Sequence, residues 1–136
     1  MIIISVDLGK ARTGLAISDK SGFLASSLCV VEEKSPNKIL EKVAKLVVEN
    51  KAELVVVGLP KNMDNTEGES AKNAREFANN LSELTGIKTV MYDERGTTIT
   101  AHGYLNERDV RGKKRKAQVD CVAASIILQN YLDSIR

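Results

Sequence analysis

The stretch Ile2-Ile3-Ile4-Ser5-Val6-Asp7-Leu8-Gly9-Lys10-Ala11-Arg12-Thr13-Gly14 decides how the rest of the chain is interpreted. Its β-branched opening is typical of an inner strand that is apolar on both faces. Asp7 follows that run without a polar transition. A carboxylate in such a place costs free energy unless a cation, a hydrogen-bond donor or solvent in a cleft compensates for it. Asp7 is therefore a candidate ligand.

Two glycines bracket an arginine directly after this acid. Gly9 and Gly14 allow the backbone to turn tightly and to approach a ligand, and Arg12 between them carries a planar guanidinium suited to phosphate oxygens. The alternative is a hairpin turn with a surface arginine, because short glycine-spaced motifs often occur by chance. This stretch by itself leaves both interpretations open.

Size and composition predict one domain. A chain of 136 residues, taken as a single unit over 1–136, can bury a core without disulfides or metal. Its hydrophobic share of 43% is ordinary, whereas its aromatic share of 4% argues against platforms that stack single-stranded bases.

The cysteines and the hydropathy pattern predict a cytoplasmic protein. Cys29 and Cys121 have no second cysteine or histidine at zinc-ligand spacing, so we expect both to be buried small hydrophobes. No segment is long and apolar enough to span a membrane, and the chain starts with a strand pattern, not a signal peptide. A reducing cytoplasm fits these features.

Basic residues gather in one short segment although the net charge is only +2. Such a cluster is an electrostatic footprint for phosphates, and a solvated loop is the alternative. Its members are Arg108, Arg111, Lys113, Lys114, Arg115 and Lys116.

Hydrophobic periodicity predicts an α/β fold with a mixed five-stranded sheet, in the order strand, strand, strand, helix, strand, helix, strand, helix. Short connections favour an antiparallel meander for the first three strands, and the helical crossover makes the later ones parallel. Strands are expected at Ile2–Val6, Thr13–Ser18, Phe23–Val31, Glu53–Gly58 and Lys88–Tyr92; helices at Pro36–Asn50, Glu69–Thr85 and Ala117–Ile135, with a weaker one at Thr98–Glu107.

A polar segment, Leu59–Gly68, follows the strand that ends at Gly58. Ligand sites in open α/β sheets collect at the carboxyl ends of parallel strands, so Asp64, Thr66 and Glu67 are candidates for substrate contact. The alternative is that Asn65, Thr66 or Glu67 caps the next helix. Capping is favoured over metal ligation for Asp64 and Glu67.

Acids recur where the predicted sheet ends. Asp93 and Glu94 follow the last strand, and Asp120 lies in the first turn of the predicted final helix, where the helix dipole also favours an acid. We expect Asp7, one of Asp93 and Glu94, and Asp120 to meet at one edge. Crowded carboxylates repel one another, and hard divalent cations relieve that repulsion.

This arrangement favours hydrolysis of a nucleic-acid backbone. Two magnesium ions about 4 Å apart can activate water and stabilise the leaving oxygen of a phosphodiester. His102, the single histidine, could act as a general base, but a helix-surface role is favoured because no serine or cysteine nucleophile pattern accompanies it.

The chain resembles the YqgF/RuvX family, small bacterial proteins with an RNase H-like fold that are related to the Holliday-junction resolvase RuvC. The stretches that carry the resemblance span nearly the whole chain in order. They are Asp7-Leu8-Gly9 with Arg12 and Gly14, Val57-Gly58-Leu59-Pro60, Met63-Asp64-Asn65-Thr66-Glu67-Gly68, Asp93-Glu94-Arg95 with Thr97-Thr98, and Lys114-Arg115-Lys116 through Asp120 to Ala123-Ala124 and Ile127-Leu128-Gln129.

The resemblance implies a three-layer RNase H-like nuclease that matures the 5′ end of the small-subunit ribosomal RNA precursor. It implies that Asp7, Glu94 and Asp120 are catalytic and bind Mg²⁺ or Mn²⁺. We expect contacts to the nucleic acid from Arg12, Arg95, Lys113, Lys114, Arg115 and Lys116. The chain departs from the family at Gly96, usually leucine, and at Asn65, usually glycine. Gly96 could loosen the turn that orients Glu94.

Other functions remain open at this stage. A Holliday-junction resolvase would use the same phosphate chemistry on branched DNA, and an inactive nucleic-acid-binding module would keep the fold. An actin-like kinase domain shares the opening strand and Asp-x-Gly turn but needs a second lobe. The sequence does not choose between a monomer and a homodimer.

Overall fold

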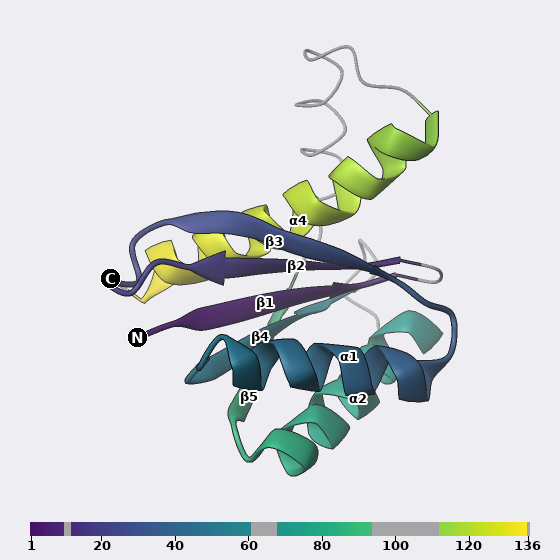
Figure 1. The fold of residues 1–136 in the computed structure, drawn as a ribbon, viewed down its shortest axis with the longest axis horizontal. Coiled ribbons are helices and arrows are strands. Elements are labelled where there is room, and N and C mark those ends of the chain that lie inside the picture. The colour runs from purple at the N-terminus through teal and green to yellow at the C-terminus, as the bar shows by residue number, and fades with distance from the viewer. Residues whose placement is uncertain (10–11, 61–67, 94–111, 136) are drawn as a thin grey trace.

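A computed structural model describes residues 1–9, 12–60, 68–93 and 112–135, with side chains of the last helix described from residue 122 onward. The elements follow the predicted order (Figure 1). They are β1 (Ile3–Leu8), β2 (Arg12–Ser18), β3 (Ala25–Glu32), α1 (Pro36–Glu49), β4 (Leu54–Leu59), α2 (Glu69–Thr85), β5 (Lys88–Asp93) and α4 (Gly112–Ser134).

The five strands form one mixed sheet in the order β3-β2-β1-β4-β5. β1, β2 and β3 pair antiparallel, which confirms the predicted meander. β4 runs parallel to both β1 and β5, as the helical crossovers require. β1 extends beyond its predicted end because Asp7 pairs with Gly14 and Leu8 with Thr13. Asp7 is thus inside the strand.

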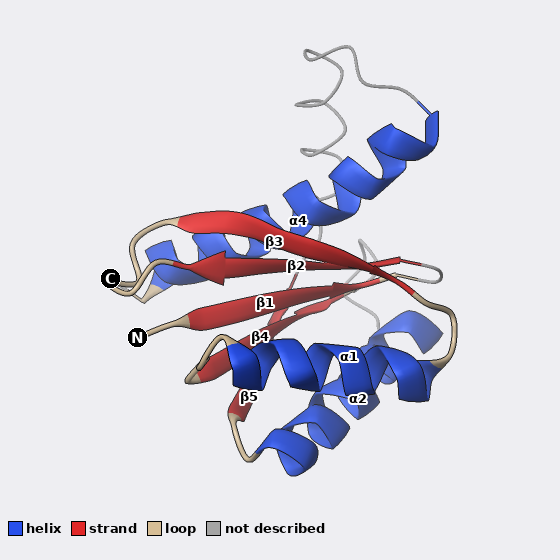
Figure 2. Ribbon diagram, in the orientation of Figure 1, coloured by secondary structure: helices blue, strands red, loops and turns tan. Residues whose placement is uncertain are grey.

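Helices cover both faces of the sheet, which gives three layers (Figure 2). α1 and α2 pack on one face, where Ile4 and Val6 of β1 belong to the core beneath them. α4 packs on the other face, over a second cluster that includes Ile3. Successive strand residues point to opposite faces, so one strand supplies both clusters.

The first two helices begin and end close to their predicted bounds. Ser35 is the N-cap residue of α1, without a side-chain capping hydrogen bond, and Pro36 follows it. The N-cap of α2 is Gly68, which corrects the expectation that Asn65, Thr66 or Glu67 caps this helix. α2 stops at Gly86, whose φ of +71° is the left-handed conformation that glycine adopts without steric cost.

α4 begins earlier than predicted, at Gly112 and not at Ala117. Lysine and arginine are good helix formers, so the basic run extends the helix toward its N-terminus. A solvated loop was one of the two interpretations of this run. Asp120 consequently lies more than two turns into α4, at about 3.6 residues per turn, and the prediction that it occupies the first turn is wrong.

Side-chain hydrogen bonds fix α4 on the sheet at two places. The buried Ser5 hydroxyl donates to the carbonyl oxygen of Ala124 over 2.7 Å. Gln129 accepts from the amide of Ala25 (3.0 Å) and donates to the carbonyl oxygen of Phe23 (2.9 Å). The helix is therefore tied to β1 in its middle and to the β2–β3 connection near its end.

The β2–β3 connection has its own polar anchor. The Asp19 carboxylate accepts hydrogen bonds from the backbone amide of Phe23 and from the Ser21 hydroxyl, both 2.9 Å long. These donors hold the pKa of Asp19 below its ordinary value. On β3, Cys29 is half-buried, and burial raises the pKa of its thiol.

Replacing Gln129 by alanine removes both hydrogen bonds to the β2–β3 connection. We expect a loss of about 1–3 kcal/mol in the free energy of unfolding, because two neutral hydrogen bonds contribute roughly 0.5–1.5 kcal/mol each. Urea denaturation measures it. Asn130→Ala, at the exposed next position of the same helix, is the control. Equal destabilisation by the two variants would contradict the anchoring role of Gln129.

Candidate functional site

Asp7 lies near the carboxyl end of β1, in the middle of the sheet, and is half-buried. It is in phase with Ile3, which packs in the cluster beneath α4, and with Ser5, which bonds to α4. Since alternate residues share a face, Asp7 lies on the α4 side of the sheet. The prediction of an acid at the end of a buried strand is confirmed for this residue.

Glycines flank Asp7 on both neighbouring strands. Gly14 of β2 is its direct cross-strand partner. On β4, Val57 pairs with Val6, so the next residue, Gly58, is level with Asp7 on the other side. Strands are about 4.8 Å apart, so side chains at these positions would stand next to the carboxylate. With glycine at both positions, neither neighbouring strand places a side chain there, a feature that sequence spacing did not reveal.

The Ser5–Ala124 hydrogen bond determines which part of α4 lies over Asp7. Gln129, five residues after Ala124, bonds to Ala25, whose cross-strand partner Ser18 accepts a hydrogen bond from Ile3 at the start of β1. Strand and helix therefore run in opposite directions. Asp7 is two strand residues beyond Ser5, about 6.7 Å. Asp120 is four helix residues before Ala124, about 6 Å in the same direction. The backbone register therefore places the Asp120 position on the Asp7 side of Ala124 along the helix.

Asp93, the first of the two acids that follow the last predicted strand, belongs to the other face. It ends β5 and pairs with Leu59 of β4. Tyr92 packs in the cluster beneath α4, whereas Met91 packs against the α1–α2 core. Asp93 is in phase with Met91, so the strand directs it away from the face that carries Asp7.

Arg12 opens β2, in phase with Gly14 and hence on the face of Asp7. Its side chain is only 18% exposed, and its Nε lies 3.5 Å from Oε1 of Glu32, its cross-strand partner on β3. Glu32 is 70% exposed, so this ion pair is screened and weak. It still orients the guanidinium at the sheet edge, and sequence reasoning gave no sign of Glu32.

Gly9 serves the hairpin that joins β1 to β2. A Cβ at this position would collide with the backbone carbonyl oxygen of Arg12. Glycine is thus required for the close approach of the two chain segments, as the sequence indicated, with no ligand needed to explain it.

The remaining expected site residues are only partly described. Lys113, Lys114, Arg115 and Lys116 lie on the first turns of α4, where the structure describes the backbone alone. Other predictions fall outside the described residues, namely those on Asp64, Thr66, Glu67, Glu94, Arg95, His102, Arg108 and Arg111. Within the described part of the chain, no three acidic, histidine or cysteine side chains form a group that could hold a metal ion.

Comparison with known proteins places the chain in a family. The family model described as "RuvX: Holliday junction resolvase" matches residues 1–134. The chain belongs to the RuvX family. Among RuvX relatives, a Shouchella clausii protein named "Putative pre-16S rRNA nuclease" is 44% identical, covering 98% of this chain and 95% of its own. A Clostridium botulinum protein of the same name is 43% identical, covering 99% and 98%.

Solved structures share the fold of this RuvX family member. RuvC of Thermus thermophilus, in complex with a Holliday junction substrate, superposes with a TM-score of 0.65 at 15% identity, covering 99% of this chain and 95% of its own. Fowlpox virus resolvase with Holliday junction DNA gives 0.61 at 15% identity, covering 99% of each chain. The predicted RNase H-like α/β fold is thereby confirmed. No helix in the described ranges is long and apolar enough to cross a membrane.

Proposed function

We propose that this chain is a metal-dependent nuclease that hydrolyses phosphodiester bonds while processing the 5′ end of pre-16S ribosomal RNA. The observation that carries the proposal is the environment of Asp7. A half-buried carboxylate stands at the carboxyl edge of the sheet between two glycine positions, beneath the helix that carries Asp120. The names of relatives about 40% identical over nearly full length support the RNA substrate. Such processing belongs in the cytoplasm.

The proposed metal ligands are Asp7, Glu94 and Asp120. The donors are all carboxylate oxygens, which suit Mg²⁺ or Mn²⁺, and no side chain of Gly14 or Gly58 stands beside the Asp7 carboxylate. Asp93 is a poorer candidate than Glu94 because β5 directs it to the opposite face. When bound, a pair of ions would supply an activated water and stabilise the leaving oxygen.

The chain's own residues hold and orient the strand to be cut. Arg12, whose Nε lies 3.5 Å from Glu32, carries a planar guanidinium on the same face of the sheet as Asp7. Arg95 and the polar residues Asp64, Thr66 and Glu67 follow parallel strands whose carboxyl ends share that edge, so we propose them as further substrate contacts.

The basic run at the start of α4 favours an anionic partner. Lys113–Lys116 lie where the helix dipole is positive, and consecutive cations there repel both the dipole and one another. A phosphate backbone relieves both effects, and the backbone amides of a helix start also bind phosphate. We therefore propose that this helix end grips the substrate next to the metal site.

Cleavage of branched DNA is the second candidate function. Its specific support is the fold shared with two resolvases that were solved with Holliday junction DNA. At 15% identity that likeness extends to the fold alone, so ribosomal RNA processing is the first proposal. Junction resolution needs two paired cuts and hence a homodimer, whereas RNA trimming is open to a monomer.

Asp7→Asn should abolish cleavage while leaving RNA binding intact, because the amide keeps the side-chain shape but loses the charge that holds a cation. We expect the rate to fall at least about 100-fold, the scale seen when a key electrostatic group is removed. The assay offers precursor RNA and a four-way DNA junction side by side with Mg²⁺. Glu83→Gln, on the exposed side of α2, is the control. Residual activity equal to that of Glu83→Gln would refute the catalytic assignment.

Alanine substitutions at Lys113–Lys116 should reduce the salt dependence of RNA binding. Each lost phosphate contact flattens the slope of log affinity against log salt by about one unit. The slope is measured by fluorescence anisotropy over a range of KCl concentrations. The control replaces Lys38, Lys42 and Lys45 on α1, at the opposite face of the sheet, and the change in slope is compared per charge removed. An unchanged slope in the α4 variant would mean that these side chains only face solvent.

A further inference from the structure

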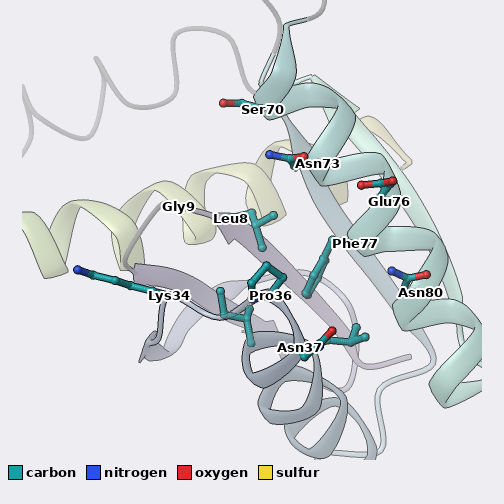
Figure 3. Close-up of a pocket in the computed structure, with 12 residues that line it drawn as sticks. Leu8, Gly9, Lys34, Pro36, Asn37, Ser70, Asn73, Glu76, Phe77 and Asn80 are labelled. Carbon is teal, nitrogen blue, oxygen red and sulfur yellow. The ribbon is translucent and has the colours of Figure 1, made fainter.

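A cleft opens on the face of the sheet opposite to Asp7. It has a volume of ≈ 330 Å³ and lies between the beginning of α1 and one side of α2. Leu8 of β1, Pro36 of α1 and Phe77 of α2 contribute to its apolar lining (Figure 3). Its size is at the lower end of the range for small-ligand sites, roughly 300–1,000 Å³.

Polar side chains line the rim of this cleft. Figure 3 shows Ser70, Asn73, Glu76 and Asn80 in a row along α2, and Asn37 at the beginning of α1. The structure gives none of these five side chains a hydrogen bond or ion pair with any other described residue. Amide, hydroxyl and carboxylate groups are thus spaced along the rim, over the roughly 15 Å that ten residues of α2 span.

The cleft adjoins the proposed catalytic edge. Leu8 lines it, and the preceding residue of the same strand is Asp7, which lies on the other face. Gly9, at the end of β1, also lines the cleft. A nucleic-acid strand with one phosphate beside Asp7 would reach the cleft by passing over this edge of the sheet.

We propose that the cleft holds an unstacked nucleobase of the strand that is cut, close to the scissile phosphate. This inference rests on the proposed nuclease function and adds a base-recognition site to it. Asparagine amides carry both a donor and an acceptor, which match the edge of a base, and a carboxylate accepts from exocyclic amino groups. The apolar floor suits a base face.

The charges in the cleft favour a base over a phosphate. Lys34 is the one cation among the described residues that line it, and Glu76 opposes any anion placed beside α2. A phosphate would meet that carboxylate without a second cation to offset it. A neutral base with amino groups gains a hydrogen bond from the same carboxylate.

The test measures RNA binding in the Asp7→Asn background, so that the probe stays intact in Mg²⁺. The probes are a short single-stranded RNA and a series in which one internal nucleotide at a time lacks its base. Fluorescence anisotropy compares the Asp7→Asn parent with Asn73→Leu and with Asn79→Leu, a control on the same helix that does not line the cleft. Both changed positions are exposed, and leucine is a good helix former.

In the parent, removal of one particular base should weaken binding roughly five- to tenfold, the equivalent of about 1–1.4 kcal/mol. Asn73→Leu should weaken binding of the intact RNA by a similar factor, leave the salt slope unchanged, and abolish the effect of that missing base. Asn79→Leu should behave as the parent does. Glu76→Gln should change which base is preferred at that position.

Two different failures are distinguishable. If the parent binds RNA but Asn73→Leu and Asn79→Leu behave alike, the base site is refuted and the nuclease proposal stands. If every missing base has the same effect, the base site is likewise refuted. If the wild-type chain neither binds nor cleaves RNA or junction DNA, the proposed function fails, and the base site fails with it. If the cleft instead binds a free peptide saturably, and Asn73→Leu does not change RNA binding, the base site is also refuted.

Discussion

The 2.7 Å hydrogen bond from Ser5 to the carbonyl of Ala124 sets the register on which the proposed active site depends. An apolar helix face can slide along an apolar sheet at little cost, since the hydrophobic effect is not directional. A buried hydroxyl that would otherwise lose its partner fixes one position, at a cost of about 1–3 kcal/mol if it is left unsatisfied. With Ala124 held over Ser5, the proposed site has Asp120 at the edge that Asp7 occupies. Gln129 secures the far end of the same helix.

Because successive residues of β1 point to opposite faces of the sheet, the proposed metal site and the cleft lie on different faces. Asp7 lies on the face covered by α4, with glycine positions on both neighbouring strands, and the proposal places the metal chemistry there. Leu8 turns to the other face and lines the cleft between α1 and α2. A strand that passes over this edge would meet cation chemistry on one side and base recognition on the other. Separating them leaves each environment suited to its own ligand, charged on one side and mostly neutral on the other.

Much of the fold could be predicted because it depends on local pattern. The apolar run of β1, the stop at Gly86 and the helical spacing in α2 each identify an element without reference to distant residues. The start of α4 was missed because four consecutive cations are typical of a solvated loop, although each of them favours a helix. The cap at Gly68 was missed because nearby residues have better capping side chains.

The site was less predictable because it depends on how distant segments align. Nothing local in the sequence places Gly58 level with Asp7; the pairing of Val6 with Val57 does so. Sequence alone left Asp93 and Glu94 equivalent, and the phase of β5 separates them by assigning Asp93 to the face of Met91. Glu32, which orients Arg12, pairs with it only through the register of β2 and β3. Cross-strand register of this kind has no signature in a single sequence.

The central claim is that Asp7 and Asp120 share a metal site from which Asp93 is excluded. Titration with Mn²⁺ in the absence of substrate, followed by electron paramagnetic resonance, tests this claim. The variants to compare are Asp7→Asn, Asp120→Asn, Glu94→Gln and Asp93→Asn. The account predicts that the first three variants lose most Mn²⁺ binding, whereas Asp93→Asn binds as the wild type does. Full binding by Asp120→Asn, or loss of binding by Asp93→Asn with Glu94→Gln unaffected, would contradict it.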